Sequence, residues 1–314
     1  MFKIQTLLLA ISITLIIAIS IFVQVLLGFD TTVLNPNYYN NMIEKHHLYE
    51  LPQNYVLLNI KENSDLLLSE PICNVLNPSI SVAFSDEWAK YQSEKTINNT
   101  INYIKGNEDE LKLEVILKDR KEYLAEDITN SLNTKYNPEE LAVFKIDSAE
   151  KAASSIMKSA NLPDSINIVT VLDVSEKGFL YVVNSLKQYY SVIKFAPYLL
   201  LVLLVSLLIF IGRNGLGIKW LGYSFLISAC LTVIGVFIAS IYLDNFLADN
   251  ISKQSDLLTT IGTNPYILAS IIKNSLIIAI KKISFISGVI GAILFLWGKF
   301  RLDKYQRNLL TSEI

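Results

Sequence analysis

The sequence predicts an α+β extracytoplasmic domain inserted between the first and second of four transmembrane α-helices. Four apolar segments each approach the roughly 20 residues that a helix needs to cross a bilayer. They cover residues 7–27, 195–211, 220–242 and 276–297. A long polar stretch separates the first segment from the second, and it contains both helical and strand periodicity. Basic residues gather at one end of each segment, so the charge pattern also predicts an orientation.

The basic residues predict which side of the membrane each segment end faces. Lys3 precedes the first segment, and Arg213 and Lys219 flank the short turn between the second and third. Four further basic residues follow the fourth segment: Lys299, Arg301, Lys304 and Arg307. Because positive residues favour the cytoplasmic side, we expect a multi-pass plasma-membrane protein with both termini in the cytoplasm. The large domain would then lie outside the membrane.

Composition and charge restrict the partners. Hydrophobic residues make up 52% of the 314 residues, which is typical of a membrane protein with a folded polar part. Residues 29–194 contain 24 acidic and 16 basic side chains, whereas the three cytoplasmic pieces contain seven basic and two acidic ones. An acidic outer domain repels nucleic acid, so no nucleic-acid partner is expected. The basic pieces suit the anionic inner leaflet, and the lipid bilayer is therefore the first predicted partner.

Residues 1–28 form the predicted N-terminal transmembrane anchor. A secretory signal peptide is the alternative, since Lys3 precedes an apolar run that contains small residues. However, the apolar core is longer than the roughly 7 to 15 residues typical of a signal peptide, and residues 26–30 contain no small-x-small cleavage pattern. We therefore expect this segment to be retained and to anchor the outer domain, residues 29–194.

Two helices are well marked in the first half of the outer domain. An Asn-Pro pair predicts a helix over residues 37–49, because proline suits the first helical turn. Ser85, followed by two acidic residues, predicts the start of a second helix, and Gly106 predicts its end. Trp88 and Tyr91 are expected on the buried face of that second helix.

The remaining outer-domain helices follow candidate caps. Asp119 and Ser148 each precede a run of apolar residues at helical spacing. Residues 179–194 are amphipathic and continue without a breaker towards the second apolar segment, which predicts a helix that emerges from the membrane. Three other apolar runs could be helix or strand: residues 55–60, 66–68 and 141–146.

Two strands complete the predicted α+β domain. Residues 111–117 alternate between apolar and polar side chains, which is the period of a half-buried strand. Residues 166–172 are rich in β-branched side chains, which favour strands. We expect the helix that begins at Ser85 to pack against the first of these strands.

The rest of the chain is expected to form the membrane mount. Residues 195–242 predict a transmembrane hairpin, and residues 243–275 a smaller outer loop with an amphipathic helix. Residues 276–298 predict the fourth transmembrane helix, although two lysines near its start leave open whether it spans fully or lies partly at the interface. Residues 299–314 form a basic cytoplasmic tail.

The apolar segments favour packing over transport. The second and third contain no ionisable side chain, whereas ion pathways generally require buried charges. Small residues at helical spacing instead predict close packing of the third and fourth segments through Gly235, Ala239, Gly288 and Gly291. A partner membrane protein or a homo-oligomer could use one of these faces.

No catalytic or metal site stands out. His46 and His47 are the only histidines, and neighbours on a helix point about 100° apart, so they cannot readily share a metal ion. A zinc site would need further ligands, for which Glu44 and Glu50 are the nearest candidates. We therefore predict no catalytic residues, no metal ligands and no cofactor, and the ligand-binding residues remain unknown.

Other suggestive clusters have simpler explanations. The acidic residues 108–110 lack the spacing of a calcium loop, and the glycine-rich residues 212–217 lack the Lys-Ser/Thr of a phosphate loop. Glu139 and Glu140 fit the first turn of a helix. Cys73 lies in an apolar stretch and is expected to be buried.

Several short motifs resemble those of a group of prokaryotic membrane proteins. They are Leu-Asn-Pro-Asn-Tyr-Tyr at residues 34–39, Leu-Tyr at 48–49, Glu-Trp at 87–88, Ile-Asn-Tyr-Ile-Lys-Gly at 101–106 and Tyr-Leu at 123–124. The group resembled is one of uncharacterised four-helix proteins with an N-terminal anchor, an outer α+β domain and a C-terminal membrane hairpin. The resemblance implies this architecture and no activity.

Two functions are compatible with these observations. The first is a non-enzymatic integral membrane protein whose outer domain binds a ligand, an envelope component or a partner protein. The alternative is a membrane-interface enzyme that acts on a lipid or envelope substrate. Its first candidate residues would be Tyr38, Tyr39, His46, His47 and Trp88.

Overall fold

The chain folds into two compact units, which we call the membrane unit and the polar unit. The computed structural model describes residues 2–45, 49, 53–57, 60, 70–167, 176–212, 215–250 and 265–312. The membrane unit comprises the described residues of Met1–Asn35, Leu186–Gln254 and Asn264–Ile314. The polar unit comprises those of Pro36–Ser185.

The predicted α+β fold class is wrong, because the described part of the chain is almost entirely helical. Helices account for 86% of it, and its one sheet has two strands of three residues each. Four helical stretches are long and apolar enough to cross a membrane: Thr6–Thr31, Lys177–Ile211, Leu216–Phe246 and Ala269–Asn308.

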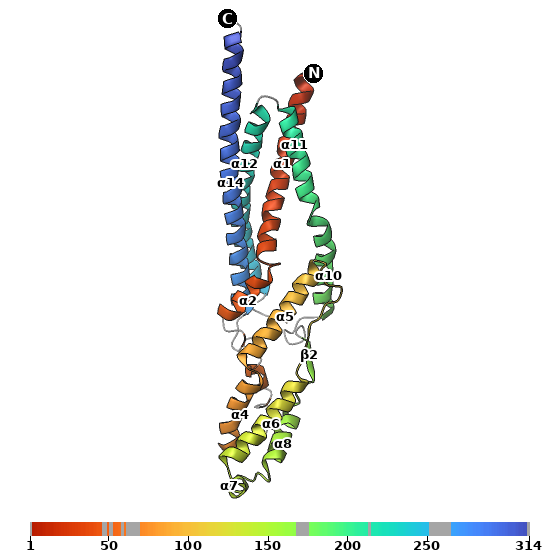
Figure 1. The fold of residues 1–314 in the computed structure, drawn as a ribbon, viewed down its shortest axis with the longest axis vertical. Coiled ribbons are helices and arrows are strands. Elements are labelled where there is room, and N and C mark those ends of the chain that lie inside the picture. Colours follow the sequence, from red (N-terminus) through yellow and green to blue (C-terminus); the bar gives the residue numbers. More distant parts are fainter. Residues whose placement is uncertain are drawn as a thin grey trace. The chain divides into compact units, whose positions relative to one another are not determined.

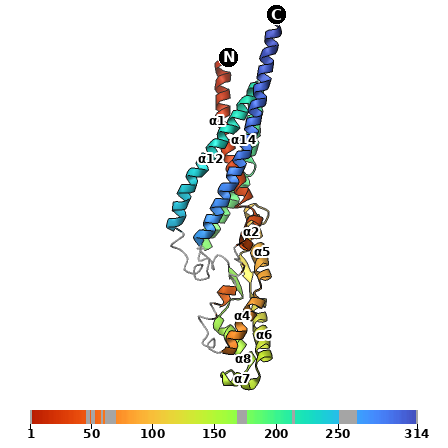
Figure 2. The same cartoon turned by 90° about the vertical axis from the view of Figure 1, so that its left-hand side faces the viewer.

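Four long helices form the membrane unit. They are α1 (Phe2–Thr31), α11 (Ala196–Ile211), α12 (Leu216–Asn250) and α14 (Pro265–Ser312), and they lie side by side (Figures 1 and 2). The start of α1, the turn between α11 and α12 and the end of α14 lie at the same end of this bundle (Figure 1). We call it the basic end, since all the predicted cytoplasmic lysines and arginines belong to these three regions.

The two longest helices extend well beyond the hydrocarbon core of a bilayer. At 1.5 Å per residue, α12 and α14 extend for about 52 Å and about 72 Å, against a hydrocarbon core of about 30 Å. Helix α14 is unbroken from Pro265 through Lys281 and Lys282, so the helix at the end of the predicted outer loop is continuous with the fourth segment. Near their ends away from the basic end, Asp244 of α12 and the buried Lys273 of α14 form an ion pair.

Helices α12 and α14 are in backbone contact at glycines. A Cβ atom added to Gly222 or Gly298 would lie closer than 3 Å to backbone atoms of the facing helix, and at Gly291 it would lie 2.9 Å from the Gly222 carbonyl oxygen. Small residues allow the two backbones to approach, and this close packing stabilises helix pairs in lipid, where the hydrophobic effect does not drive helices together. The predicted role of Gly291 is therefore confirmed. That of Gly235 is wrong, since nothing lies within 4 Å of its added Cβ.

A buried glutamine links three helices of the bundle. Gln24 of α1 is 4% exposed, and its Nε2 donates hydrogen bonds of 3.2 Å to the hydroxyls of Ser228 on α12 and Ser287 on α14. Among the described residues, its Oε1 atom and the hydroxyl of Ser20 have no hydrogen-bond partner. The contact is thus polar but incompletely satisfied.

The polar unit contains α2 (Pro36–Lys45), α4 (Glu70–Ala83), α5 (Asp86–Ile104), α6 (Lys118–Lys135), α7 (Pro138–Val143) and α8 (Ala149–Ala160). Helix α10 (Glu176–Ile193) begins in the polar unit, and Lys194 and Phe195 separate it from α11. The predicted unbroken helix into the second segment is therefore interrupted at these two residues.

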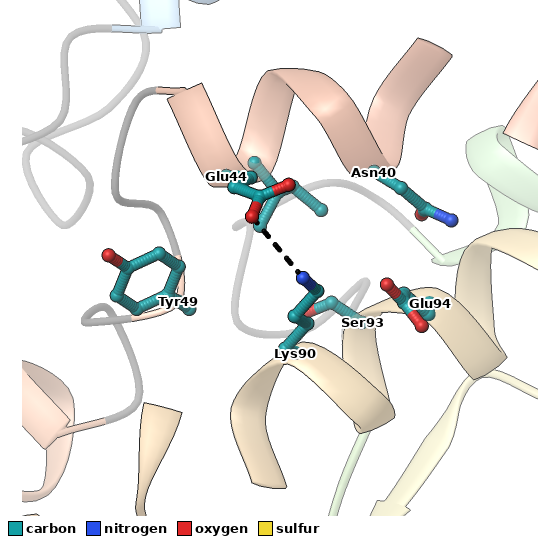
Figure 3. A pocket seen from close by; sticks show the side chains of 7 residues that line it. Asn40, Glu44, Tyr49, Lys90, Ser93 and Glu94 are labelled. Carbon is teal, nitrogen blue, oxygen red and sulfur yellow. Dashed lines mark hydrogen bonds and ion pairs between the residues drawn. The ribbon is translucent and has the colours of Figure 1, made fainter. Parts of the chain in front are cut away.

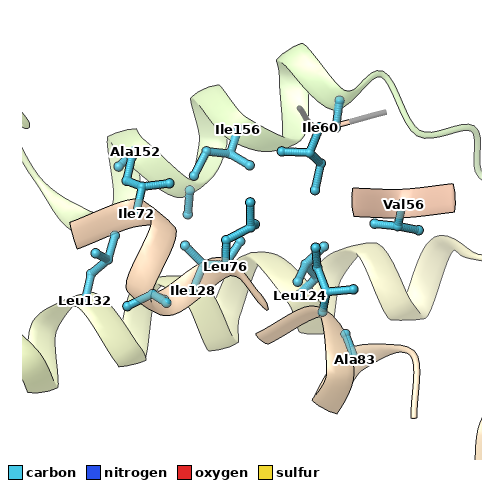
Figure 4. Close-up of a cluster of buried hydrophobic side chains, with 14 of the residues drawn as sticks. Val56, Ile60, Ile72, Leu76, Ala83, Leu124, Ile128, Leu132, Ala152 and Ile156 are labelled. Atoms are coloured by element: carbon cyan, nitrogen blue, oxygen red, sulfur yellow. The ribbon is translucent and has the colours of Figure 1, made fainter. Parts of the chain in front are cut away.

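One hydrophobic core stabilises the polar unit. Helices α4, α6 and α8 contribute most of it, including Ile72, Leu76, Leu124, Ile128 and Ile156 (Figure 4). Burying each such side chain contributes about 1.5–3 kcal/mol. Sequence analysis did not predict α4. Its Pro71 lies in the first turn, which suits proline, but Pro78 lies inside the helix, where proline normally interrupts it.

Local capping explains several boundaries. Ser148 caps α8 by accepting a hydrogen bond of 3.2 Å from the Lys151 amide, as predicted. Asn137 and Glu140 form a capping box at α7, which confirms that Glu139 and Glu140 belong to the first turn of a helix. Asp119 is not the cap of α6: Leu117 occupies that position, and Asp119 lies in the first turn, where a negative charge suits the helix dipole.

The two predicted strands exist only as short segments. Strand β1 (Glu114–Ile116) pairs antiparallel with β2 (Ser165–Asn167), with Val115 opposite Ile166. Apolar and polar side chains do alternate in residues 111–117, since Leu113 and Leu117 are buried. The pattern belongs to a short extended segment that packs against helices. The rest of the second predicted strand, residues 168–172, lies outside the described residues.

Candidate ligand-binding groove

Helix α5 carries the candidate site, and its ends follow from local sequence. Ser85 accepts a hydrogen bond of 3.4 Å from the Trp88 amide, and two acidic residues occupy the first turn. Beyond the last turn, Gly106 has φ +75°, a conformation that glycine adopts without strain. Both predicted boundaries of this helix are confirmed.

The two faces of α5 differ sharply. Ala89, Ile101 and Ile104 are buried, whereas Tyr91 is 59% exposed. The prediction that Tyr91 belongs to the buried face is therefore wrong. Trp88 is half-buried at the edge of the core, with its ring edge-to-face to Phe84 at 5.5 Å between centroids.

A polar groove of about 450 Å³ runs along the exposed face of α5, which is within the roughly 300–1,000 Å³ typical of ligand pockets. Its lining combines amides, carboxylates, ammonium groups and one aromatic ring. The residues are Tyr91, Gln92, Glu94, Lys95, Thr96, Asn98, Asn99, Asn102, Glu108, Lys112 and Glu114.

Three hydrogen bonds hold the wall opposite α5. The amide side chain of Asn99 donates to the Glu110 carbonyl at 3.3 Å and accepts from the Lys112 backbone N–H at 2.6 Å. Glu114 of β1 accepts a hydrogen bond from the Ser165 hydroxyl of β2. The segment that follows α5 is thus held beside the helix, and the groove has a defined second side.

The groove is suited to a polar ligand with a flat face. Asparagine is a weak helix former, yet Asn98, Asn99 and Asn102 all lie on this one helix. The Asn99 amide holds the opposite wall, whereas the amides of Asn98 and Asn102 can each donate and accept hydrogen bonds, as hydroxyl groups require of a partner. The exposed Tyr91 ring, with the Lys95 ammonium 5.9 Å from its centroid, adds an apolar surface with a cation beside it.

A second hollow, between α2 and α5, is too small for a ligand. Asn40, Glu44, Tyr49, Lys90 and Glu94 are among the residues that line it (Figure 3). Its volume of about 10 Å³ is the space of a single water molecule. The ion pair between Lys90 and Glu44, at 3.5 Å, joins the two helices across it. This hollow is a helix–helix contact.

The residues named for the alternative enzyme do not form a catalytic constellation in the described part of the chain. Tyr38 and Tyr39 pack edge-to-face at 5.3 Å between ring centroids. Burial, followed by the neighbouring Tyr38, raises the pKa of Tyr39 to about 12, so its hydroxyl stays protonated at neutral pH. Trp88 packs against the core and under the Arg120 guanidinium, 5.7 Å from its ring. His46 and His47 lie outside the described residues, as does Glu50.

Electrostatics elsewhere in the polar unit is local. Lys121 forms an ion pair of 2.7 Å with the exposed Asp164, and this hydrogen bond lowers the pKa of that carboxyl group. In the described ranges, no group of three or more His, Cys, Asp or Glu side chains could hold a metal ion. Glu108, from the acidic cluster considered for calcium, lines the α5 groove instead.

The apolar helices define the class: this is a multi-pass integral membrane protein. No protein-family model, curated protein or solved structure matches the chain. The groove itself was missed by sequence analysis. The signal was present as three asparagines on one helix beside a tyrosine, but the helical period assigned that tyrosine to the core.

Proposed function

We propose that this protein is a non-enzymatic membrane protein whose polar unit lies outside the membrane and binds a polyhydroxylated envelope component, such as a glycan segment, in the α5 groove. The observation that carries the proposal is the exposed Tyr91 ring among convergent amides and carboxylates. An aromatic face packs against the apolar side of a sugar ring, while amides and carboxylates bond its hydroxyls.

The proposed orientation is supported by contacts at the basic end of the bundle. The Lys219 ammonium lies 5.9 Å from the Phe295 ring, and the Arg301 guanidinium lies 4.9 Å from the Trp297 ring. Aromatic rings next to basic residues are typical of a membrane–water interface, and an excess of such bases is typical of its cytoplasmic side. An even number of spans also puts both termini on that side.

The orientation can be tested with a cysteine that the protein already has. Cys73 on α4 is exposed, contrary to its predicted burial, so it can react with a membrane-impermeant maleimide. In a Cys230→Ser background on intact cells, we expect Cys73 to be labelled and a cysteine introduced at Asp303 to be protected. The reverse pattern would show that the polar unit is cytoplasmic.

Ligand binding can be tested with the full chain in lipid nanodiscs on an array of neutral and amino-sugar oligosaccharides. We expect Tyr91→Ala to weaken the best-bound glycan by about tenfold, the upper end of a ring-stacking contribution of roughly 0.5–1.5 kcal/mol. Asn98→Ala and Asn102→Ala should weaken the same glycan by smaller factors, since each removes one hydrogen-bonding group.

The matched control is Tyr123→Ala on α6. Tyr123 is also an exposed tyrosine of the polar unit, but it does not line the groove. It should leave glycan binding unchanged. Absence of binding to every glycan by the native protein, or equal losses in the Tyr91 and Tyr123 variants, would contradict the proposal.

A further inference from the structure

Another cavity lies entirely within the membrane unit, and none of its lining residues belongs to the α5 groove. Its volume is about 380 Å³, and it is formed by the end of α1 and by the junction of α10 and α11. Its wall is mainly apolar and aromatic, with Leu26, Phe29, Ile193, Phe195 and Tyr198. Three further lining residues bring polar groups: Asp30, Tyr190 and Lys194.

Opposite charges meet at this cavity. The Tyr190 hydroxyl donates a hydrogen bond of 3.0 Å to Asp30, which fixes the carboxylate against the aromatic wall. The Lys194 ammonium lies 5.9 Å from the Tyr190 ring centroid and 5.3 Å from that of Phe195. In the described part of the chain, Lys194 forms no ion pair.

The cavity lies where two apolar runs end. The apolar part of α1 stops just before Asp30, and the apolar run that continues into α11 begins at Phe195, the residue before that helix. Both points belong to the end of the bundle opposite the basic end, because the start of α1 and the end of α11 lie at the basic end (Figure 1). Tyrosines at such a position are typical of the level of lipid headgroups.

We propose that this cavity binds the headgroup of a phospholipid that carries both a phosphate and an ammonium group. The phosphate meets the Lys194 ammonium, and the lipid ammonium meets the Asp30 carboxylate and the faces of the aromatic rings. The acyl chains follow the apolar surface of α1 and α11 into the bilayer.

The charge pair decides between lipid classes. An anionic lipid without an ammonium group would satisfy Lys194 but would bring its negative charge towards Asp30. Two negative charges in one cavity repel each other, and this repulsion is stronger beside a low-dielectric membrane than in water. A headgroup with both charges complements both residues.

The test uses the full-length protein in nanodiscs of phosphatidylethanolamine and phosphatidylglycerol in equal amounts. Native mass spectrometry of the released protein reports which lipids remain bound. We expect a preference for phosphatidylethanolamine that Asp30→Asn lowers by about tenfold, the equivalent of 1.4 kcal/mol. Lys194→Met should reduce retention of both lipids, because it removes the phosphate partner.

Two control variants keep the proposal falsifiable. Lys281→Met and Asp303→Asn remove equivalent charges from the membrane unit away from this cavity and should change neither quantity. Melting temperatures in detergent show whether each variant is folded. Equal retention of both lipids by the native protein, or an unchanged preference in a folded Asp30→Asn variant, overturns the proposal. Displacement of the lipid by soluble glycerophosphoethanolamine would overturn the lipid assignment and indicate a free headgroup ligand.

Discussion

The polar unit and the membrane unit are each stabilised by a different kind of internal contact. In the polar unit, one cluster of buried aliphatic side chains joins α4, α6 and α8. Among the described residues of the membrane unit, the corresponding cluster has three buried members, Ile16, Leu208 and Leu221, while many large apolar side chains face outward. There, α12 and α14 instead meet at glycines.

The difference follows from the solvent of each unit. Water drives apolar side chains together, so a polar unit is stabilised by the area that it buries. Lipid is as apolar as leucine, so helices in a bilayer are held by close backbone packing and by hydrogen bonds between helices. Three pairs of substitutions test this difference between the two units.

The largest expected effect is in the core of the polar unit. Phe84 is fully buried, and Phe84→Ala should lower the free energy of unfolding of this unit by about 3–5 kcal/mol. Hydrogen exchange of the α4, α6 and α8 amides in the full chain measures it. The matched change, Phe237→Ala on α12, removes a ring that is 62% exposed and should change protection of the bundle little. Similar losses of protection in the two variants would contradict the claim that burial of apolar side chains stabilises the polar unit more than the membrane unit.

An intermediate effect is expected where the bundle helices touch. Gly222→Leu inserts a side chain into the backbone of α14 and should destabilise the membrane unit by about 1–3 kcal/mol. Thermal unfolding in mild detergent measures the change. Gly235→Leu is the control, because an added Cβ there meets nothing within 4 Å. If the Gly235 variant is the more damaged one, the helices do not pack through the Gly222 contact.

The smallest effect is expected at the polar link of the bundle. Gln24→Leu removes two hydrogen bonds between helices, each worth about 0.6 kcal/mol in membrane proteins, but it also removes a buried oxygen without a partner. We therefore expect a loss below about 1 kcal/mol in detergent unfolding, and a smaller one for Ser287→Ala. A loss of several kcal/mol would mean that this hydrogen-bond network, rather than glycine packing, holds the bundle.

Sequence reasoning succeeded where one local rule acts alone. The caps at Ser85 and Ser148 are confirmed because a side chain and an amide three residues later decide them. It failed at α4, where no helix was predicted, because burial of the apolar face stabilises a helix that contains Pro78. It also failed at Tyr91, since helical spacing alone does not determine which side of α5 meets the core.

The four membrane-spanning helices could be predicted from the apolar segments, because a single long apolar run is stable in lipid as a helix whose backbone hydrogen bonds are satisfied internally. That the polar unit is helical and not α+β could be seen in the folded structure alone. Alternating residues 111–117 fit a strand of any length, and the partner that limits β1 to three residues is distant in sequence. Both candidate sites, the α5 groove and the cavity at Asp30 and Lys194, likewise depend on segments that only folding brings together.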